Sequence, residues 1–178
     1  MQFKVLLNLG GVYSRVGDDQ SAFDCFEHAL AIARSFRYRR IEAAALGNLG
    51  VLYRHAGECE KAIASHQLAL ESYVSLRDPK GQANALGNLG LVNSDMGNHA
   101  IALTFYDEQL KIAREISDPH GEATALYNSS LSLHKTGRIS LAKEQATTAL
   151  KIYEQVADGI ALQKVRKTLD AWLAADAK

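Results

Sequence analysis

The chain has 178 residues, of which 47% are apolar, 20 are basic and 20 are acidic, so its formal net charge is zero. This balance lacks the basic excess of nucleic-acid-binding proteins, and no apolar stretch reaches the roughly 18 residues of a membrane span. Cys25 and Cys59 belong to no CxxC motif, and the N-terminus shows no signal-peptide pattern. We therefore expect a reduced, cytoplasmic setting.

Apolar residues at helical spacing predict helices along the whole chain, and no strand. Glycine ends every second helix, whereas Asp18, Asp78 and Asp118 are expected N-caps, the last two followed by proline. The helices are predicted over residues 4–16, 20–36, 41–56, 60–76, about 79–96, 99–116, about 119–136, 140–156 and 160–175. The loops of two to four residues make successive helices antiparallel neighbours.

A fixed repeat of forty residues organises these helices. Ala-Leu-Gly-Asn-Leu-Gly occurs at 45–50 and again at 85–90, and weaker copies at 6–10 and 125–130 keep the same register. Self-similarity at such a period indicates a repeat array.

Glycine in the middle of a helix costs up to about 1 kcal/mol relative to alanine. Gly10, Gly50 and Gly90 therefore predict a close approach between the two helices of each repeat. The small residues expected on the facing surface are Ala22, Ala62, Ala102 and Ala142.

The spacing of the second copy resembles the tetratricopeptide repeat, whose pattern is W-x2-L-G-x2-Y, then A-x3-F, then A. Its matching residues are Leu46, Leu49, Gly50, Tyr53, Gly57, Ala62, His66 and Ala69. The other copies match in register, although Asn93 replaces the tyrosine of the third, and Ser129 and Ser130 replace Leu-Gly in the fourth. The forty-residue period is similar to the long repeats of kinesin light chains, Pins-type adaptors and arrays attached to bacterial signalling NTPases.

The resemblance implies an all-α fold, an α–α superhelix formed by a single array over residues 1–178. Its four helix-turn-helix repeats would cover about 1–38, 39–78, 79–118 and 119–158, with a capping helix over 159–176. In those families the array binds proteins, uses no cofactor and is not an enzyme. We expect a scaffold that holds an extended peptide or helix of a partner. A regulatory sensor array of a larger signalling protein and an oligomerisation spacer are the alternatives.

In tetratricopeptide arrays the first helix of each repeat lines a concave groove, and the residue before Leu-Gly faces into it. That residue is Asn8, Asn48, Asn88 or Asn128 here. The resemblance implies an asparagine ladder, because each amide offers a donor and an acceptor to the backbone of a peptide. The alternative is that each asparagine bonds only within its own helix. The further groove candidates are Arg15, Arg54, His55, Tyr127, His134 and Lys135, with Lys4 and Asp95 on the same face.

The remaining polar signals are weaker. Arg34, Arg37, Arg39 and Arg40 surround Tyr38, where an acidic partner or a phosphate group could dock, or where the loop is simply solvated. The six histidines form no ligand pair, and no Ser/His/Asp motif is present. We predict neither a metal site nor a catalytic site.

The two ends of the array differ. Asp170 stands at the register position of the mid-helix glycines, and a charged residue there should stop further stacking. We expect Val165, Leu169 and Leu173 to pack inward, Trp172 to cover the last repeat, and Lys164, Arg166 and Lys167 to face solvent.

The first helix has no such polar face: Phe3, Val5 and Leu6 form an uncovered apolar pattern. We expect either a longer parent array or self-association through the first helix pair.

Overall fold

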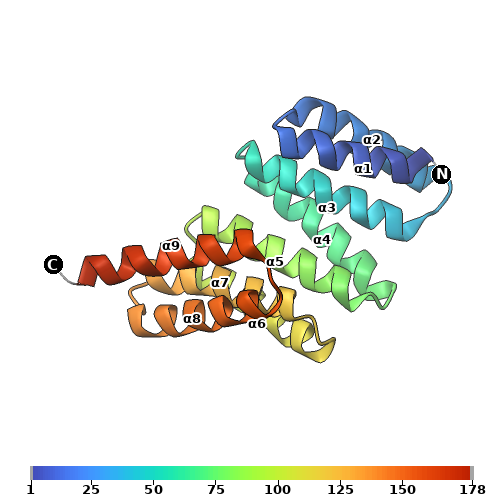
Figure 1. The fold of residues 1–178 in the computed structure, drawn as a ribbon. Helices are drawn as coiled ribbons and strands as arrows, with labels where there is room; N and C mark the ends of the chain where they lie inside the picture. The colour runs from blue at the N-terminus through green and yellow to red at the C-terminus, as the bar shows by residue number, and fades with distance from the viewer. Residues whose placement is uncertain (1, 177–178) are drawn as a thin grey trace. The chain divides into compact units, whose positions relative to one another are not determined.

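The computed structural model describes residues 2–176, and these form nine α-helices and no strand (Figure 1). The helices are α1 Gln2–Val16, α2 Asp19–Ser35, α3 Arg39–His55, α4 Cys59–Ser75, α5 Pro79–Asp95, α6 His99–Glu115, α7 Pro119–Lys135, α8 Ile139–Gln155 and α9 Gly159–Asp176. Every boundary lies within two residues of the predicted one. The predicted all-α helical repeat fold is confirmed.

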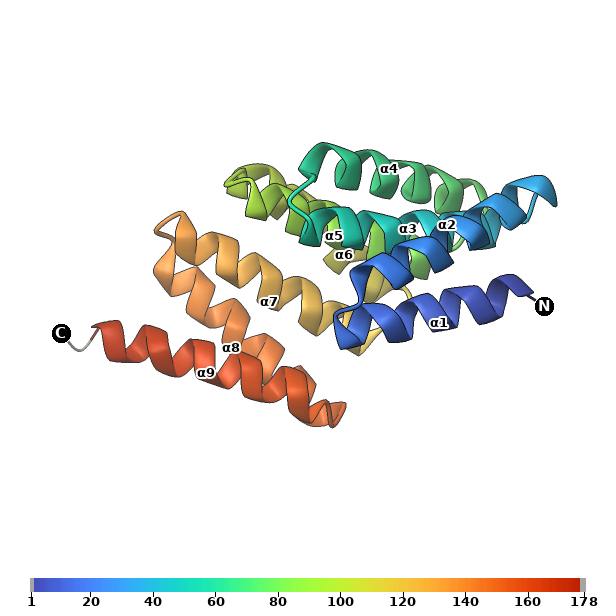
Figure 2. The same ribbon diagram turned by 90° about the horizontal axis from the view of Figure 1, so that it is seen from above.

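The helices form two compact units, and the boundary between them falls inside α5, after Val92. In the first unit α1 packs against α2, α2 against α3, and α3 against α4 (Figure 2). In the second unit α6 packs against α7, α7 against α8, and α8 against α9. Each unit has its own apolar core, built around Phe26 and Leu49 in the first and around Leu126 and Val165 in the second.

The turns that follow the helices share one geometry. At the end of α1, Gly17 has φ +84°, and the N–H of Asp18 donates to the carbonyl oxygen of Tyr13 at 3.0 Å. The hydrogen bond thus joins a residue after the helix to the last turn of the helix, and the residue before the donor has a left-handed backbone. This arrangement is the Schellman motif. The other residues with positive φ are Gly57, Gly97 and Gly137, and, between the repeats, Arg37, Arg77, Ser117 and Ala157.

Aspartates start four helices in one way. Asp18 accepts a hydrogen bond from the N–H of Ser21 at 3.1 Å, and Asp78, Asp118 and Asp158 each accept from the N–H three residues on at 3.0 Å. A carboxylate in this position satisfies a backbone donor that the helix leaves free, and it suits the positive end of the helix dipole. The predicted caps at Asp18, Asp78 and Asp118 are confirmed.

The mid-helix glycines make room for a ring on the neighbouring helix. A Cβ atom at Gly10 would lie 2.6 Å from Cε1 of Phe26, and one at Gly50 would lie 2.6 Å from Cε1 of His66. Both rings are buried, with 2% and 0% of their surface exposed. The close approach is therefore between helix backbone and aromatic ring, while the facing alanines, all fully buried, let the two helices come together.

The fourth repeat reverses this arrangement. Ser130 takes the glycine position and Ala146 takes the ring position, and both are fully buried. Losing the ring leaves space for the serine side chain, whose hydroxyl donates to the carbonyl oxygen of Tyr127 at 2.6 Å. The departure of Ser130 from the repeat pattern is thus explained by the paired change at Ala146.

The last helix differs from its prediction at one residue. Val165 and Leu169 are buried and Trp172 is half-buried against the second core, as expected, and Asp170 is exposed. Leu173, however, has 58% of its surface exposed and does not pack inward. Leu173 lies eight residues after Val165, and at 100° per residue this rotation carries it to the edge of the buried stripe.

Candidate functional site

The asparagines of the first unit occupy one register position on α1, α3 and α5. Asn8 is exposed, whereas Asn48 and Asn88 are half-buried. The side-chain amides of Asn48 and Asn88 form no hydrogen bond with any other described residue. Each amide therefore keeps two donors and an oxygen acceptor for a ligand.

The charged candidates of this unit lie in the last turns of α1 and α3. Arg15 and His55 are exposed, and Arg54 is half-buried. Arg54 also affects the interior of the unit. Burial is the main cause of the lowered pKa of His66, and the positive charge of Arg54 is the second cause. The two arginines place positive charge at the negative end of each helix dipole.

In the second unit α9 already contacts two of the candidates. Asn128 is half-buried and Lys135 is exposed, but Tyr127 is buried and its hydroxyl lies 3.0 Å from that of Thr168. The ring of His134 stacks on Trp172, with centroids 4.3 Å apart and 10° between the planes. Sequence reasoning missed these contacts because they join residues 41 and 38 positions apart.

His66 is the most unusual polar residue of the interior. It is fully buried, and neither ring nitrogen has a hydrogen-bond partner. Burial, followed by the charge of Arg54, lowers its pKa from 6.5 to about 4, so the ring is neutral at pH 7. His66 occupies the position of Phe26 in the preceding repeat and acts as a core residue.

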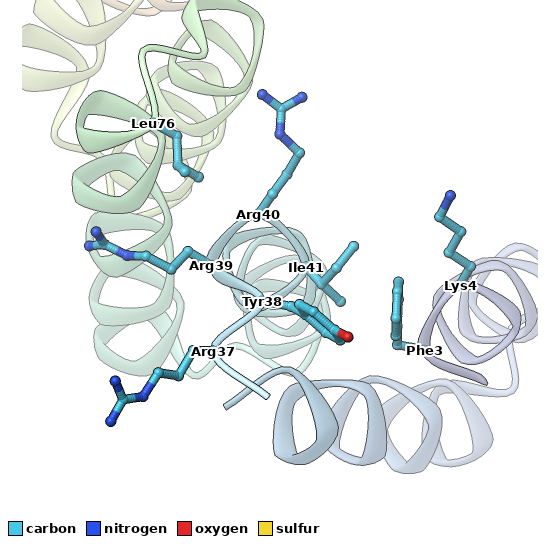
Figure 3. A pocket seen from close by; sticks show the side chains of 8 residues that line it. All are labelled: Phe3, Lys4, Arg37, Tyr38, Arg39, Arg40, Ile41 and Leu76. Atoms are coloured by element: carbon cyan, nitrogen blue, oxygen red, sulfur yellow. The ribbon is translucent and has the colours of Figure 1, made fainter. Parts of the chain in front are cut away.

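A pocket of about 480 Å³ lies where α1, α3 and α4 come together. Figure 3 shows the rings of Phe3 and Tyr38 facing each other inside it, with basic side chains around them. The arginine cluster was visible in the sequence, but the pocket was not, because it needs the first turn of α1 and Leu76 at the end of α4. Arg34 does not line it and instead pairs with Glu42 at 3.0 Å.

The described residues offer no metal-binding cluster, since no three of their His, Cys, Asp and Glu side chains come together as a metal site would require. Within residues 2–176 no helix combines the length and apolar character that crossing a membrane would take. Cys25 is buried and Cys59 half-buried, and both are free thiols.

Solved structures share this fold. BtubC from P. vanneervenii superposes with a TM-score of 0.79 at 20% identity, over 95% of this chain and 70% of that one. A Rap protein complexed with Competence and Sporulation Factor gives a TM-score of 0.88 at 18% identity, over 99% of this chain and 49% of its own. A STAND protein with a tetratricopeptide repeat sensor from Pyrococcus horikoshii gives 0.78 at 15% identity, over 92% and 25%. The chain thus spans about half of the Rap protein and a quarter of the STAND protein.

Among curated proteins the sequence has no match. The tetratricopeptide repeat family, however, matches residues 2–73 and 81–155, which is most of the chain. The repeat register, the helix pairs and the glycine–aromatic contacts agree with this match. The chain therefore belongs to the tetratricopeptide repeat family.

Proposed function

We propose that this chain is a non-catalytic protein-interaction module in which residues 1–178 act as one array, and that it binds an extended peptide of a partner protein. The observation that carries the proposal is the pair of half-buried amides at Asn48 and Asn88, neither of which is hydrogen-bonded to a described residue. Asn8 continues the same register in the first unit, and Asn128 holds the equivalent repeat position in the second unit. Arg15, Arg54, His55, Lys135 and the accessible part of His134 supply side-chain selectivity.

The chemistry of the amides explains why a peptide backbone is the ligand. An asparagine side chain presents the same donor and acceptor as a peptide group, so it can pair with both the N–H and the C=O of one ligand residue. A partly buried amide is already partly desolvated, which lowers the cost of exchanging water for the ligand. Affinity then comes from the ligand backbone, and side chains adjust it.

A protein of the same fold, the Rap protein, was solved in complex with Competence and Sporulation Factor, which supports a binding role for the fold. The STAND protein, in which the repeats form a sensor, favours a second candidate, a sensor segment of a larger protein. The scaffold and the sensor differ in what peptide binding must cause. In a sensor, binding must change the state of an attached domain, whereas a scaffold need only hold its partner.

A peptide selected from a random phage-displayed library against the wild-type chain provides the probe. Replacing both Asn48 and Asn88 by alanine should weaken its binding by roughly 1–3 kcal/mol, because each loses hydrogen bonds to a desolvated peptide group. Isothermal titration calorimetry measures the loss, and circular dichroism checks that helix content is unchanged.

The matched control is Gln67→Ala with Asn98→Ala, which removes two exposed amides outside the ladder register. It should bind like the wild type. Because the ladder contacts backbone, unrelated selected peptides should lose similar affinity in the Asn48/Asn88 variant. Equal binding by that variant and the wild type would refute the proposal.

A further inference from the structure

The first junction between repeats departs from the other three. The residues that precede α5, α7 and α9 are Asp78, Asp118 and Asp158, whereas Tyr38 precedes α3. The three aspartates cap their helices, but Tyr38 makes no side-chain cap hydrogen bond. This junction has given up a stabilising carboxylate, which calls for a reason outside the helix itself.

The charge changes in the same place. Residues 37–40 read Arg-Tyr-Arg-Arg, whereas the equivalent residues 77–80, 117–120 and 157–160 read Arg-Asp-Pro-Lys, Ser-Asp-Pro-His and Ala-Asp-Gly-Ile. With histidine neutral, the first junction carries a net charge of +3, against +1, −1 and −1 at the others. The basic character is therefore strongest at the first junction.

Aromatic rings form the floor of the pocket at this junction. The ring of Tyr38 lies 5.2 Å from that of Phe3 and stacks on Phe36, with centroids 5.8 Å apart and 16° between the planes. Phe36 and Tyr38 nevertheless have 64% and 46% of their surface exposed. Ile41 and Leu76 extend the apolar lining.

Cations surround this floor, and no acidic side chain lines the pocket. Lys4, Arg37 and Arg39 form no ion pair with another described residue, and Arg40 pairs with Asp78 at 3.3 Å. In Figure 3 their charged ends point away from one another around Tyr38. A single phosphate group is bound by donors that converge on it. Cations that diverge suit a ligand whose negative charges are spread along a chain.

We propose that this pocket binds an acidic segment of a partner protein, in which an apolar side chain packs on the floor formed by the Phe3 and Tyr38 rings and flanking carboxylates pair with Lys4, Arg37 and Arg39. This site is separate from the asparagine ladder. The site complements the acidic segment in two ways. The apolar floor contacts the apolar side chain of the segment, and the unpaired cations pair with its carboxylates.

The test uses the full chain and three labelled peptides in fluorescence polarisation. The probe Glu-Asp-Leu-Asp-Glu should bind, and its affinity should fall as NaCl rises from about 50 to about 500 mM. Glu-Asp-Gly-Asp-Glu, which lacks the anchor, should bind at least about fivefold more weakly, which corresponds to a fraction of one buried leucine side chain. Gln-Asn-Leu-Asn-Gln should not bind.

Variants then locate the site. Arg37→Gln with Arg39→Gln should weaken the probe at least about threefold, since two partly exposed ion pairs are lost. Arg77→Gln with Arg138→Gln removes the same charge from two other exposed arginines, one at the second junction and one in the turn between α7 and α8, and should leave binding unchanged. Tyr38→Asp should abolish binding of the probe. It should also raise the melting temperature, because it restores the capping aspartate. The raised melting temperature would show that the variant is folded.

The outcomes decide the matter. Equal losses in the two arginine double variants would overturn the proposal in favour of general charge attraction. Binding of ATP but not of the acidic peptide would overturn it in favour of a phosphate ligand. The Asn48/Asn88 double variant should bind the probe normally, so failure of the ladder and failure of this pocket are distinguishable.

Discussion

Replacing His66 by phenylalanine should stabilise the protein. The ring of His66 lies fully buried over Gly50, and both of its nitrogens lack hydrogen-bond partners. Phe26 occupies the equivalent position over Gly10, where a Cβ atom would likewise lie 2.6 Å from the ring, so this packing accepts the larger side chain. Removing the unsatisfied nitrogens should raise the free energy of unfolding at neutral pH by about 1–3 kcal/mol.

The same substitution should remove a pH dependence. The pKa of His66 is lowered from 6.5 to about 4 in the folded chain. Between these values the unfolded state binds more protons than the folded state, so stability falls as pH falls. From about pH 7.5 to about pH 5 the wild type should lose about 2 kcal/mol through His66, and the variant should lose none of this amount.

Urea denaturation followed by circular dichroism at these two pH values measures both effects. The hydroxyl and the backbone N–H of Ser21 donate to Asp18 and lower its pKa. The backbone N–H of Ala161 does the same for Asp158. Both carboxylates therefore stay ionised at both pH values. Phe26→His is the reciprocal control and should lose stability and gain pH dependence. If the His66 variant is no more stable at the higher pH and keeps the pH dependence of the wild type, the burial argument is wrong.

Two further predictions concern α3 and α1. Gly50→Ala should lower the free energy of unfolding by about 1–3 kcal/mol, because the added Cβ overpacks against His66, and a gain in helix propensity offsets under about 1 kcal/mol of this loss. In the control Gly47→Ala the added Cβ meets nothing within 4 Å, so the same urea titration should show a neutral or stabilising effect. Val5→Glu with Val12→Glu should abolish concentration-dependent association of the wild type in sedimentation velocity, because these side chains are 64% and 44% exposed on α1; association that persists in the variant would rule out this face.

Local signals made most of the fold predictable. A helix start depends on a cap a few residues away, as at Asp118, and a helix end depends on a residue that accepts positive φ, as at Gly57. Both kinds of signal lie within one turn of the feature they specify. The forty-residue register then gave the pairing of the helices without any knowledge of long-range contacts.

Contacts between distant residues were beyond this reasoning. The stacking of His134 on Trp172 and the hydroxyl contact from Tyr127 to Thr168 depend on how α9 lies on α7, which no local pattern specifies. The ladder residues themselves came from the repeat register, whereas the half-buried, unbonded state of Asn48 and Asn88 is a property of the folded chain. The pocket around Tyr38 likewise requires three helices to meet.

The repeats also serve as a comparison of the chain with itself, and their departures fall into two kinds. Ser130 departs from glycine together with Ala146, so the change is compensated inside the core and needs no functional explanation. Tyr38 departs from aspartate on the surface, where no neighbouring residue restores the lost cap. An uncompensated departure lowers stability, so the packing of the fold supplies no reason for it. By this criterion the surface around Tyr38, more than the internal substitutions, is where the function particular to this array is to be sought.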